Sequence, residues 1–272
     1  MIIIEIKVHF QLFNQYLKSM KKFVVLFLML LPVAVFAQNQ KKGGQTKVDS
    51  LTNVIKNAQA KFTAGQMKMG TLYYNLAKEK YSQHDYLAAI SLSDSAIAYG
   101  QLANGLETKG LSYYQGGHLS EAIKALLESA KLSPGYDNNY YLGLSYYKLD
   151  SKANASQIIS AMNEAQKFKV DTMTFYYLGR SYYELSKFDS AAMNFDYLLK
   201  IEKSYEILFG AGLSNYYLGK YDQAISSLEG AYRIKADHPD LLKALAVSYI
   251  QAGKTEEGIA VAQVLLKLKK KK

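Results

Sequence analysis

The chain contains no cysteine, no tryptophan and only three prolines among its 272 residues. Without cysteine there can be no disulfide, no thiolate metal site, no cysteine nucleophile and no lipid attached through a cysteine. So few prolines favour long helices over a loop-rich sheet protein, because proline interrupts a helix wherever it falls in the interior. The remaining composition, 49% hydrophobic and 21% charged, is typical of a folded chain rather than a disordered one.

Short catalytic motifs are also missing from the sequence. It has no His-Glu-x-x-His zinc motif, no glycine-rich phosphate loop and no Gly-x-Ser-x-Gly nucleophile turn. Residues 145–148 match the Ser-x-x-Lys pattern of some hydrolases, but an internal repeat of the chain produces that match. His84 and His118 have no acidic third ligand beside them, so we interpret them as turn residues rather than metal ligands. The sequence therefore predicts no catalytic residue, no metal and no cofactor.

Residues 20–37 have the features of a secretory signal peptide. Two lysines precede an apolar run, and small residues before Gln38 form a cleavage signal, so that Gln38 becomes the first mature residue. The run is interrupted by Pro32 and is short beside the roughly 20 residues that a membrane span needs; an uncleaved anchor is the alternative. Residues 1–19 precede this signal, and we interpret them as a misassigned start, with Met20 as the true one.

Positive charge is concentrated at the two ends of the chain. The formal net charge of +10 falls to +7 without residues 1–37, which carry four lysines and one glutamate. Five further lysines, at 267 and 269–272, leave the intervening body near +2. A nucleic-acid-binding protein would need lysines and arginines clustered across its fold, so this distribution argues against nucleic acid as a partner.

A short motif with two adjacent tyrosines recurs along the chain. The letters GLSYY occur at residues 110–114 and 143–147, and GRSYY and GLSNYY follow at 179–183 and 212–217. The small residue that opens each motif, with its counterparts in the outer units, falls at Ala77, Gly110, Gly143, Gly179, Gly212 and Ala246. A second series lies twelve positions later, at Ala89, Ala122, Ala155, Ala191, Ala224 and Gly258. Spacings of 33 to 36 residues indicate a stacked array rather than one globular core.

Each unit has the pattern of two helices joined by a turn. In the fourth unit, apolar residues at helical spacing run from Tyr176 to Tyr183, and in the fifth a second amphipathic stretch runs from Ala224 to Tyr232. Breaks such as residues 116–118 separate the two stretches. The small residues allow the two helices to approach closely, and large side chains of the neighbours fill the remaining space.

This pattern resembles the tetratricopeptide repeat family, whose signature is Trp-x2-Leu-Gly-x2-Tyr, then Ala-x3-Phe, then Pro. The fourth unit carries it most completely, with Phe175, Leu178, Gly179, Tyr182, Ala191 and Phe195. Tryptophan is absent, and Asn215 replaces the motif tyrosine in the fifth unit. The resemblance extends from Gly70 to the C-terminus. It implies an all-α fold, a right-handed α-solenoid of about six stacked antiparallel helix pairs over residues 70–272.

Two further segments precede the array. Residues 38–46 form a polar, glycine-containing linker, and Asp49 or Ser50 offers an N-cap for the helix that follows. We interpret residues 47–69 as an N-terminal capping helix, since the terminal units of a repeat array need a polar outer face.

The doubled tyrosines call for an explanation, because adjacent helical residues point about 100° apart and cannot share one face. The first of each pair, as in Tyr146 and Tyr182, follows the glycine stripe, and we expect it in the core. The resemblance implies that the neighbouring stripe lines the concave groove where partners bind. The predicted groove residues are Tyr74, Tyr81, Tyr114, Tyr140, Tyr147, Tyr176, Arg180, Tyr183, Phe209 and Tyr216. Arg180 is expected to anchor a carboxylate or carbonyl of the ligand. The alternative is that these rings only pack on the next repeat.

The resemblance implies a non-enzymatic scaffold or adaptor that binds a protein or peptide in this tyrosine-lined groove. With its signal peptide, we expect it to be exported to the periplasm or cell envelope without a lipid anchor. The alternative is a structural module of a cell-envelope complex that uses its convex face or its basic C-terminal tail. That tail ends in Lys269, Lys270, Lys271 and Lys272. It either keeps the end of the array soluble or makes a weak contact with an anionic envelope surface.

Cleavage of the signal peptide can be tested on the protein made in its own cells. We expect the mature chain to begin at or near Gln38 and to carry no lipid, because the apolar run before it is a cleaved signal. N-terminal sequencing together with intact mass measures both properties. A membrane-bound chain that still contains residues 21–36 would show that the run is an anchor.

Overall fold

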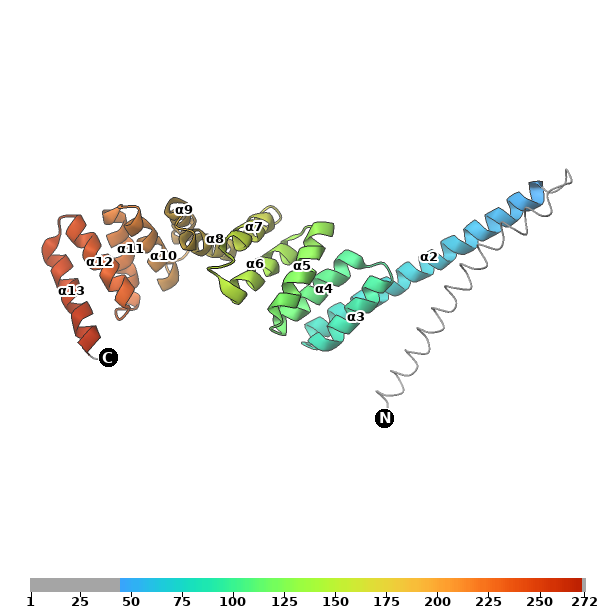
Figure 1. Cartoon of the computed structure of the whole chain (residues 1–272), viewed down its shortest axis with the longest axis horizontal. Coiled ribbons are helices and arrows are strands. Elements are labelled where there is room, and N and C mark those ends of the chain that lie inside the picture. Colours follow the sequence, from blue (N-terminus) through green and yellow to red (C-terminus); the bar gives the residue numbers. More distant parts are fainter. Residues whose placement is uncertain (1–44, 271–272) are drawn as a thin grey trace, which may run out of the picture. The chain divides into compact units, whose positions relative to one another are not determined.

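The computed structural model of the protein describes residues 45–270, with side chains for residues 52–268. Within this range the chain consists of helices joined by turns, without a strand. The first six helices are α2 (Gln45–Ser82), α3 (Tyr86–Ala98), α4 (Leu102–Gln115), α5 (Leu119–Leu132), α6 (Tyr136–Asp150) and α7 (Ala155–Gln166). They are followed by α8 (Thr172–Glu184), α9 (Phe188–Leu199), α10 (Tyr205–Tyr217), α11 (Tyr221–Ile234), α12 (Pro239–Gln251) and α13 (Thr255–Lys270) (Figure 1).

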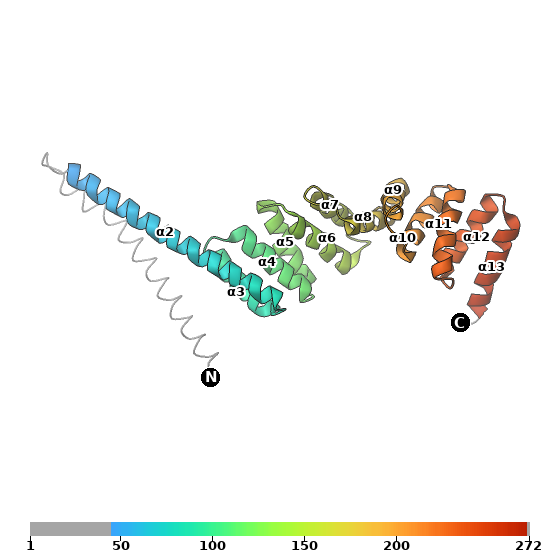
Figure 2. The same ribbon diagram turned by 180° about the vertical axis from the view of Figure 1, so that it is seen from behind.

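The chain divides into two compact units, residues 1–65 and residues 66–272. The second unit contains the predicted repeats as helix pairs, from α4 with α5 to α12 with α13. Each helix from α3 onward packs on the next one along the chain, and several first helices also touch the first helix of the following pair. The same order is visible from both sides in Figures 1 and 2. The all-α solenoid predicted from the sequence is therefore confirmed.

The two series of small residues mark where the helices of a pair meet. The alanines of the second series, from Ala89 to Ala224, are almost completely buried. On the first helices, a Cβ added to Gly110 or Gly212 would lie 2.6 Å from the Cγ of a leucine on the second helix of the same pair. At Gly143 and Gly179 the opposing side chains are a methionine and a phenylalanine. A larger residue would thus separate the helices, which is the role predicted for the glycines.

The turns between paired helices use a left-handed residue at one equivalent position. Gly117, Gly219 and Gly253 have φ values of 80°, 71° and 79° there, and Ser186 and His84 have 56° and 61°. This conformation costs little for glycine and more for a residue with a Cβ. His84 is thus a turn residue, as predicted. The third pair differs, because α6 continues through the equivalent residue, Asp150.

The longest spacing between repeats, 36 residues, arises between α6 and α7, because α6 extends to Asp150 and residues 151–154 form a longer turn before α7. The loop from α7 to α8, residues 167–171, is as long as the loop from α9 to α10, residues 200–204. Lys169 forms an ion pair with Asp171 across this loop at 3.7 Å. Asp171 also caps α8 by accepting a hydrogen bond from the backbone N–H of Met173.

The N-terminal boundary differs from the expectation. α2 is continuous from Gln45 to Ser82, so no helix break separates the predicted capping helix, residues 47–69, from the first repeat. The reason is that residues 45–82 contain no proline, and the isolated glycines 65 and 70 weaken a helix without ending it. The helix also begins inside the expected linker, residues 38–46, most of which lies outside the described residues. The capping role stays a prediction.

None of the helices in the described range is long and apolar enough to cross a membrane. The predicted signal peptide, residues 20–37, and the segment before it lie outside that range, as do the last two lysines of the tail.

The close helix contact predicts that replacing glycine by alanine will affect the free energy of unfolding differently at two helical positions, Gly212 and Gly65. Gly212→Ala should lower the free energy of unfolding by about 1–2 kcal/mol, because the added Cβ would lie 2.6 Å from Leu228 Cγ and 3.2 Å from its backbone nitrogen. Gly65→Ala is the matched control, since nothing lies within 4 Å of its added Cβ. Alanine should be neutral or stabilising there because it favours the helix. Urea denaturation followed by circular dichroism measures both; equal effects would contradict the contact.

Candidate functional site

The ten residues predicted to line a groove lie on the first helices of consecutive pairs. α2 carries Tyr74 and Tyr81, α4 carries Tyr114, α6 carries Tyr140 and Tyr147, α8 carries Tyr176, Arg180 and Tyr183, and α10 carries Phe209 and Tyr216. All except Tyr114 are half-buried. Most of these side chains thus keep one part in contact with the protein and another part in contact with solvent.

Tyr114 differs from the expectation of a groove residue. It is only 8% exposed, because its ring lies edge-on against Tyr141 with centroids 5.1 Å apart. The ammonium of Lys148 lies 4.2 Å from the same ring centroid, in a cation–π contact. Little of Tyr114 is left for a ligand to contact, so its role here is packing between α4 and α6.

The second tyrosines of the other doublets also contact the following repeat. Tyr147 meets Tyr177 of α8 with centroids 4.8 Å apart, and Tyr183 meets Tyr217 of α10 at 5.9 Å. Tyr183 also lies against Phe188 of its own pair at 5.6 Å. The rings of Tyr147 and Tyr183 therefore pack on the next repeat, as the alternative interpretation of the sequence expected.

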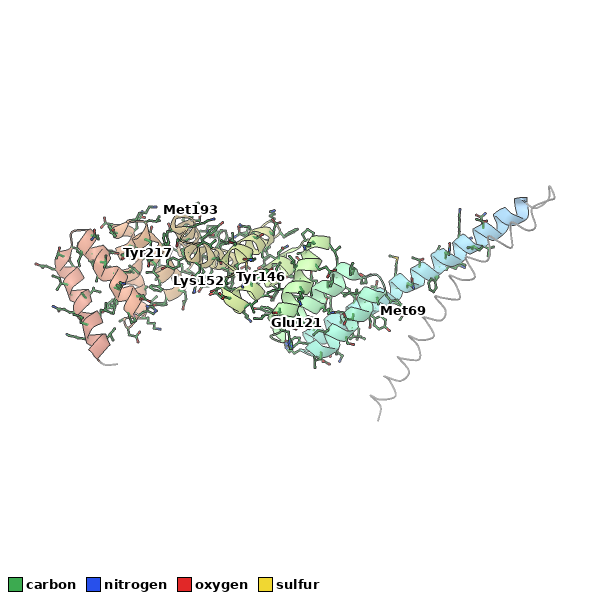
Figure 3. The ribbon with its side chains drawn as sticks, viewed as in Figure 1. Met69, Glu121, Tyr146, Lys152, Met193 and Tyr217 are labelled. Carbon is green, nitrogen blue, oxygen red and sulfur yellow. The ribbon has the colours of Figure 1, made fainter. Side chains whose placement is uncertain are left out.

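The first tyrosines, expected to be core residues, are half-buried rather than fully buried. Tyr146, which is labelled in Figure 3, lines a shallow cleft with Leu127 and Ala130 of the preceding α5. Its ring also packs on the buried cluster that contains Met162 of α7. Because neighbouring helical residues point in different directions, a doublet can serve two contacts at once. One ring packs toward the preceding repeat and the other toward the following one, which explains why the tyrosines are paired.

Arg180 lies at the centre of the predicted stripe. Its guanidinium donates a hydrogen bond to the Tyr176 hydroxyl at 3.3 Å and lies 5.9 Å from the ring centroid of Tyr147. Burial alone would lower the pKa of Arg180, but the nearby Tyr147, Tyr176 and Glu184 outweigh it and raise the pKa. The side chain is thus charged and held in place by neighbours on α6 and α8.

A cleft of about 340 Å³ opens beside Arg180, between α8, α10 and the start of α12. Three predicted residues meet in it: Arg180, Tyr183 and Phe209. Residues outside the ten predicted for the groove complete the lining: Glu184, Phe195, Tyr205, Glu206, Gly210, Leu213 and His238. The cleft therefore combines aromatic, acidic and basic groups from consecutive repeats.

One part of the cleft lining follows from a departure in the repeat. Tyr141 and Tyr177 occupy the residue two before the motif glycine, where they face Tyr114 and Tyr147. In the next unit that residue is Gly210, and a Cβ added there would lie 2.5 Å from the ring of Phe195, so Phe195 takes the space that a tyrosine side chain would need. Gly210 and Phe195 both line the cleft, together with Tyr183. The glycine was visible in the sequence, but its meaning depended on which rings face each other.

Aromatic rings form the far wall of the cleft. Tyr205 and Phe209 stack with centroids 5.6 Å apart, and the imidazole of His238 lies edge-on to Phe209 at 4.9 Å. His238 Nδ1 accepts a hydrogen bond from the backbone N–H of Leu241 at 3.4 Å, which caps α12. The ring is thereby fixed by both stacking and capping.

The phenols at the cleft keep their protons. Burial, then Tyr217 and the carboxylates of Glu184 and Asp240, raise the pKa of Tyr183 well above its usual value. Burial is also the main cause that raises the pKa of Tyr205, followed by nearby carboxylates such as Glu206. Because a protonated phenol both donates and accepts hydrogen bonds, these rings can bind polar backbone as well as apolar groups.

The other predicted residues do not join this cleft. Tyr176 lines a separate cleft of about 370 Å³ with apolar residues of α8, α9 and α10. Tyr140 stacks on Tyr136 with centroids 5.2 Å apart, and Lys78 lies over the ring of Tyr74. Tyr81 accepts a hydrogen bond from Gln115 at 3.4 Å. The predicted ladder is therefore a series of local contacts, and only Arg180, Tyr183 and Phe209 among its ten residues line the cleft beside Arg180.

A column of buried serines escaped the interpretation of the sequence. It comprises Ser112, Ser145, Ser181, Ser214 and Ser248, two residues after the small residue that opens each motif. Three of them donate a hydrogen bond to the backbone carbonyl four residues earlier. That local bond satisfies a small hydroxyl in the tightest part of the stack. The signal was the constant third letter of GLSYY.

No group of three or more histidine and acidic side chains that could hold a metal occurs in the described range. His118 is the N-cap residue that precedes α5, and its ring lies edge-on to Tyr113 with centroids 6.1 Å apart. His118 therefore packs on Tyr113 within the turn between α4 and α5.

Comparisons with known proteins agree with the helix pairs. Two tetratricopeptide repeat models match residues 176–239 and 216–271. MamA (AMB-1) is similar in structure, with a TM-score of 0.55 and 21% identity over 62% of this chain and 92% of MamA. YrrB, described as a tetratricopeptide repeat protein with an unusual peptide-binding site, gives a TM-score of 0.56 and 20% identity over 63% of this chain and 89% of YrrB. A tetratricopeptide repeat protein from Parabacteroides merdae gives a TM-score of 0.51 and 15% identity over 74% of this chain and 80% of that protein. No curated protein matches.

The fold is thus an all-α solenoid similar to those of tetratricopeptide repeat proteins, and residues 176–271 match the tetratricopeptide repeat models. At these identities the solved structures establish the fold alone.

The contact between Tyr147 and Tyr177 can be measured with a double-mutant cycle. We expect Tyr147→Ala and Tyr177→Ala to be coupled by about 0.5–1.5 kcal/mol in the free energy of unfolding, because their rings meet edge-on at 4.8 Å. Tyr147 paired with Tyr232 of the distant α11 is the control and should show no coupling. Additive effects of Tyr147 and Tyr177 would mean that the second tyrosines are independent of the next repeat.

Proposed function

We propose that the protein is an exported, non-enzymatic scaffold that binds a protein or peptide partner on the face formed by its first helices. The observation that carries this proposal is the cleft beside Arg180, where half-buried rings from consecutive repeats surround an open space. Tyrosine and phenylalanine provide a large contact area with few rotatable bonds, which suits recognition of a peptide.

The surroundings of the cleft support binding rather than catalysis. Most of its lining residues are aromatic or aliphatic, and Nδ1 of His238 is already occupied by the helix cap. The carboxylates of Glu184 and Glu206 could accept a proton, but among the described residues the lining contains no serine, threonine, cysteine or lysine that they could activate as a nucleophile. Export is expected from the signal peptide at residues 20–37, and it accords with a partner in the periplasm or cell envelope.

The similarity to YrrB also supports the proposal, since that protein is described as having a peptide-binding site. A structural role on the convex face, or through Lys269–Lys272, is the competing hypothesis. The two hypotheses place the partner on opposite sides of the helix pairs, so they can be separated by position.

A photo-cross-linking amino acid at Leu213 should capture the partner in native cells, because Leu213 lines the cleft. The matched position is Met193, a residue of α9 that is 73% exposed and lies away from the cleft lining (Figure 3). We expect a discrete cross-linked product from Leu213 and none from Met193, read by mass spectrometry.

The reverse result would favour a partner on the outer face. If removal of residues 269–272 abolishes the native association while the Leu213 position captures nothing, the tail rather than the cleft makes the contact. Either outcome would overturn the proposed groove.

A further inference from the structure

Carboxylates outnumber cations around the cleft beside Arg180. Glu184 and Glu206 line it. Asp237 and Asp240 are close enough that both help to raise the pKa of Tyr205. Among the described residues, none of these four carboxylates forms an ion pair with a lysine or arginine. The whole body between the signal peptide and the tail is near +2, so this concentration of negative charge is local.

The cations at the cleft are already engaged with aromatic rings. Arg180 is held between the Tyr176 hydroxyl and the Tyr147 ring, and the ammonium of Lys235 lies 5.8 Å from the ring centroid of Tyr205. His238 accepts a hydrogen bond at Nδ1, which requires the neutral imidazole. The carboxylates around the cleft therefore remain in excess over the cations, and none of the four forms an ion pair among the described residues.

The walls of the cleft also suit a positive group. Tyr183, Tyr205 and Phe209 present ring surfaces on which an aliphatic stem can pack, and ring faces attract a cation. The hydroxyl of Tyr205 is buried and has no hydrogen-bond partner among the described residues. Aromatic walls with flanking carboxylates are the combination that binds ammonium and guanidinium groups.

We infer that this cleft receives a basic side chain, lysine or arginine, of the bound peptide, with the cation between Glu184 and Glu206 and the stem on Phe209 and Leu213. This inference rests on the proposed function, and it assigns the chemistry of the ligand at that site. It replaces the expectation that Arg180 anchors a carboxylate, because the negative charge around Arg180 would repel one.

The experiment selects peptides from a random library, so the partner need not be identified first. A dodecapeptide phage library is panned against the purified full-length chain and against its Glu184→Gln/Glu206→Gln double variant. We expect the unmodified chain to enrich peptides with a lysine or arginine at a constant position. The double variant should still enrich peptides but lose that preference, since glutamine keeps the shape and removes the charge.

One enriched peptide then gives the quantitative test by fluorescence anisotropy. Replacing its arginine by citrulline, or its lysine by norleucine, should weaken binding to the unmodified chain about tenfold or more, because a charge-assisted hydrogen bond is lost. The same replacement should change little for the double variant. Glu121→Gln/Glu128→Gln on α5 is the matched control and should behave as the unmodified chain; both residues are exposed and outside the cleft (Glu121 is labelled in Figure 3).

The outcomes separate the two proposals. Enrichment of acidic or uncharged peptides would overturn the basic side chain and leave the groove as a binding site. A basic preference that persists in the double variant would also overturn it, by placing recognition elsewhere. If neither chain enriches any peptide sequence, the proposed function itself fails and the inference falls with it.

Discussion

Close approach of two helices at a glycine or alanine is the contact on which the rest of this structure depends. Each first helix can lie against its second helix because the residue between them has almost no side chain, and a leucine, methionine or phenylalanine fills the space opposite. A helix pair of this kind buries little apolar surface alone. Its outer residues must therefore be covered by the neighbouring pairs, and the repeat follows from that requirement.

The paired tyrosines satisfy this requirement in two directions. A ring at one position packs toward the preceding repeat, and the ring beside it reaches the first helix of the following repeat. Tyrosine suits such a position because its hydroxyl can remain in contact with water while its ring is covered. The same property leaves a partly exposed aromatic surface along the first helices, which a ligand can use without disturbing the stack.

Function in a repeat protein can arise where the repeat is interrupted. At Gly210 the tyrosine that the preceding units supply is absent, and the ring of Phe195 takes that space beside the cleft that Tyr183, Phe209 and Arg180 border. Glu184 and Glu206 give the cleft a negative charge that the body as a whole lacks. A change at one position thus alters which side chains line this part of the face.

Local periodicity was enough to predict the helix pairs and the small residues at their contacts, because both recur in the sequence every 33 to 36 residues. The same pattern named Arg180, Tyr183 and Phe209 as residues of one face. It could not reveal that Tyr114 is covered, that Tyr176 belongs to another cleft, or that Glu206 and His238 join Arg180. Those outcomes depend on which side chains of different repeats meet, and residues about 30 positions apart meet only through the packing of the stack.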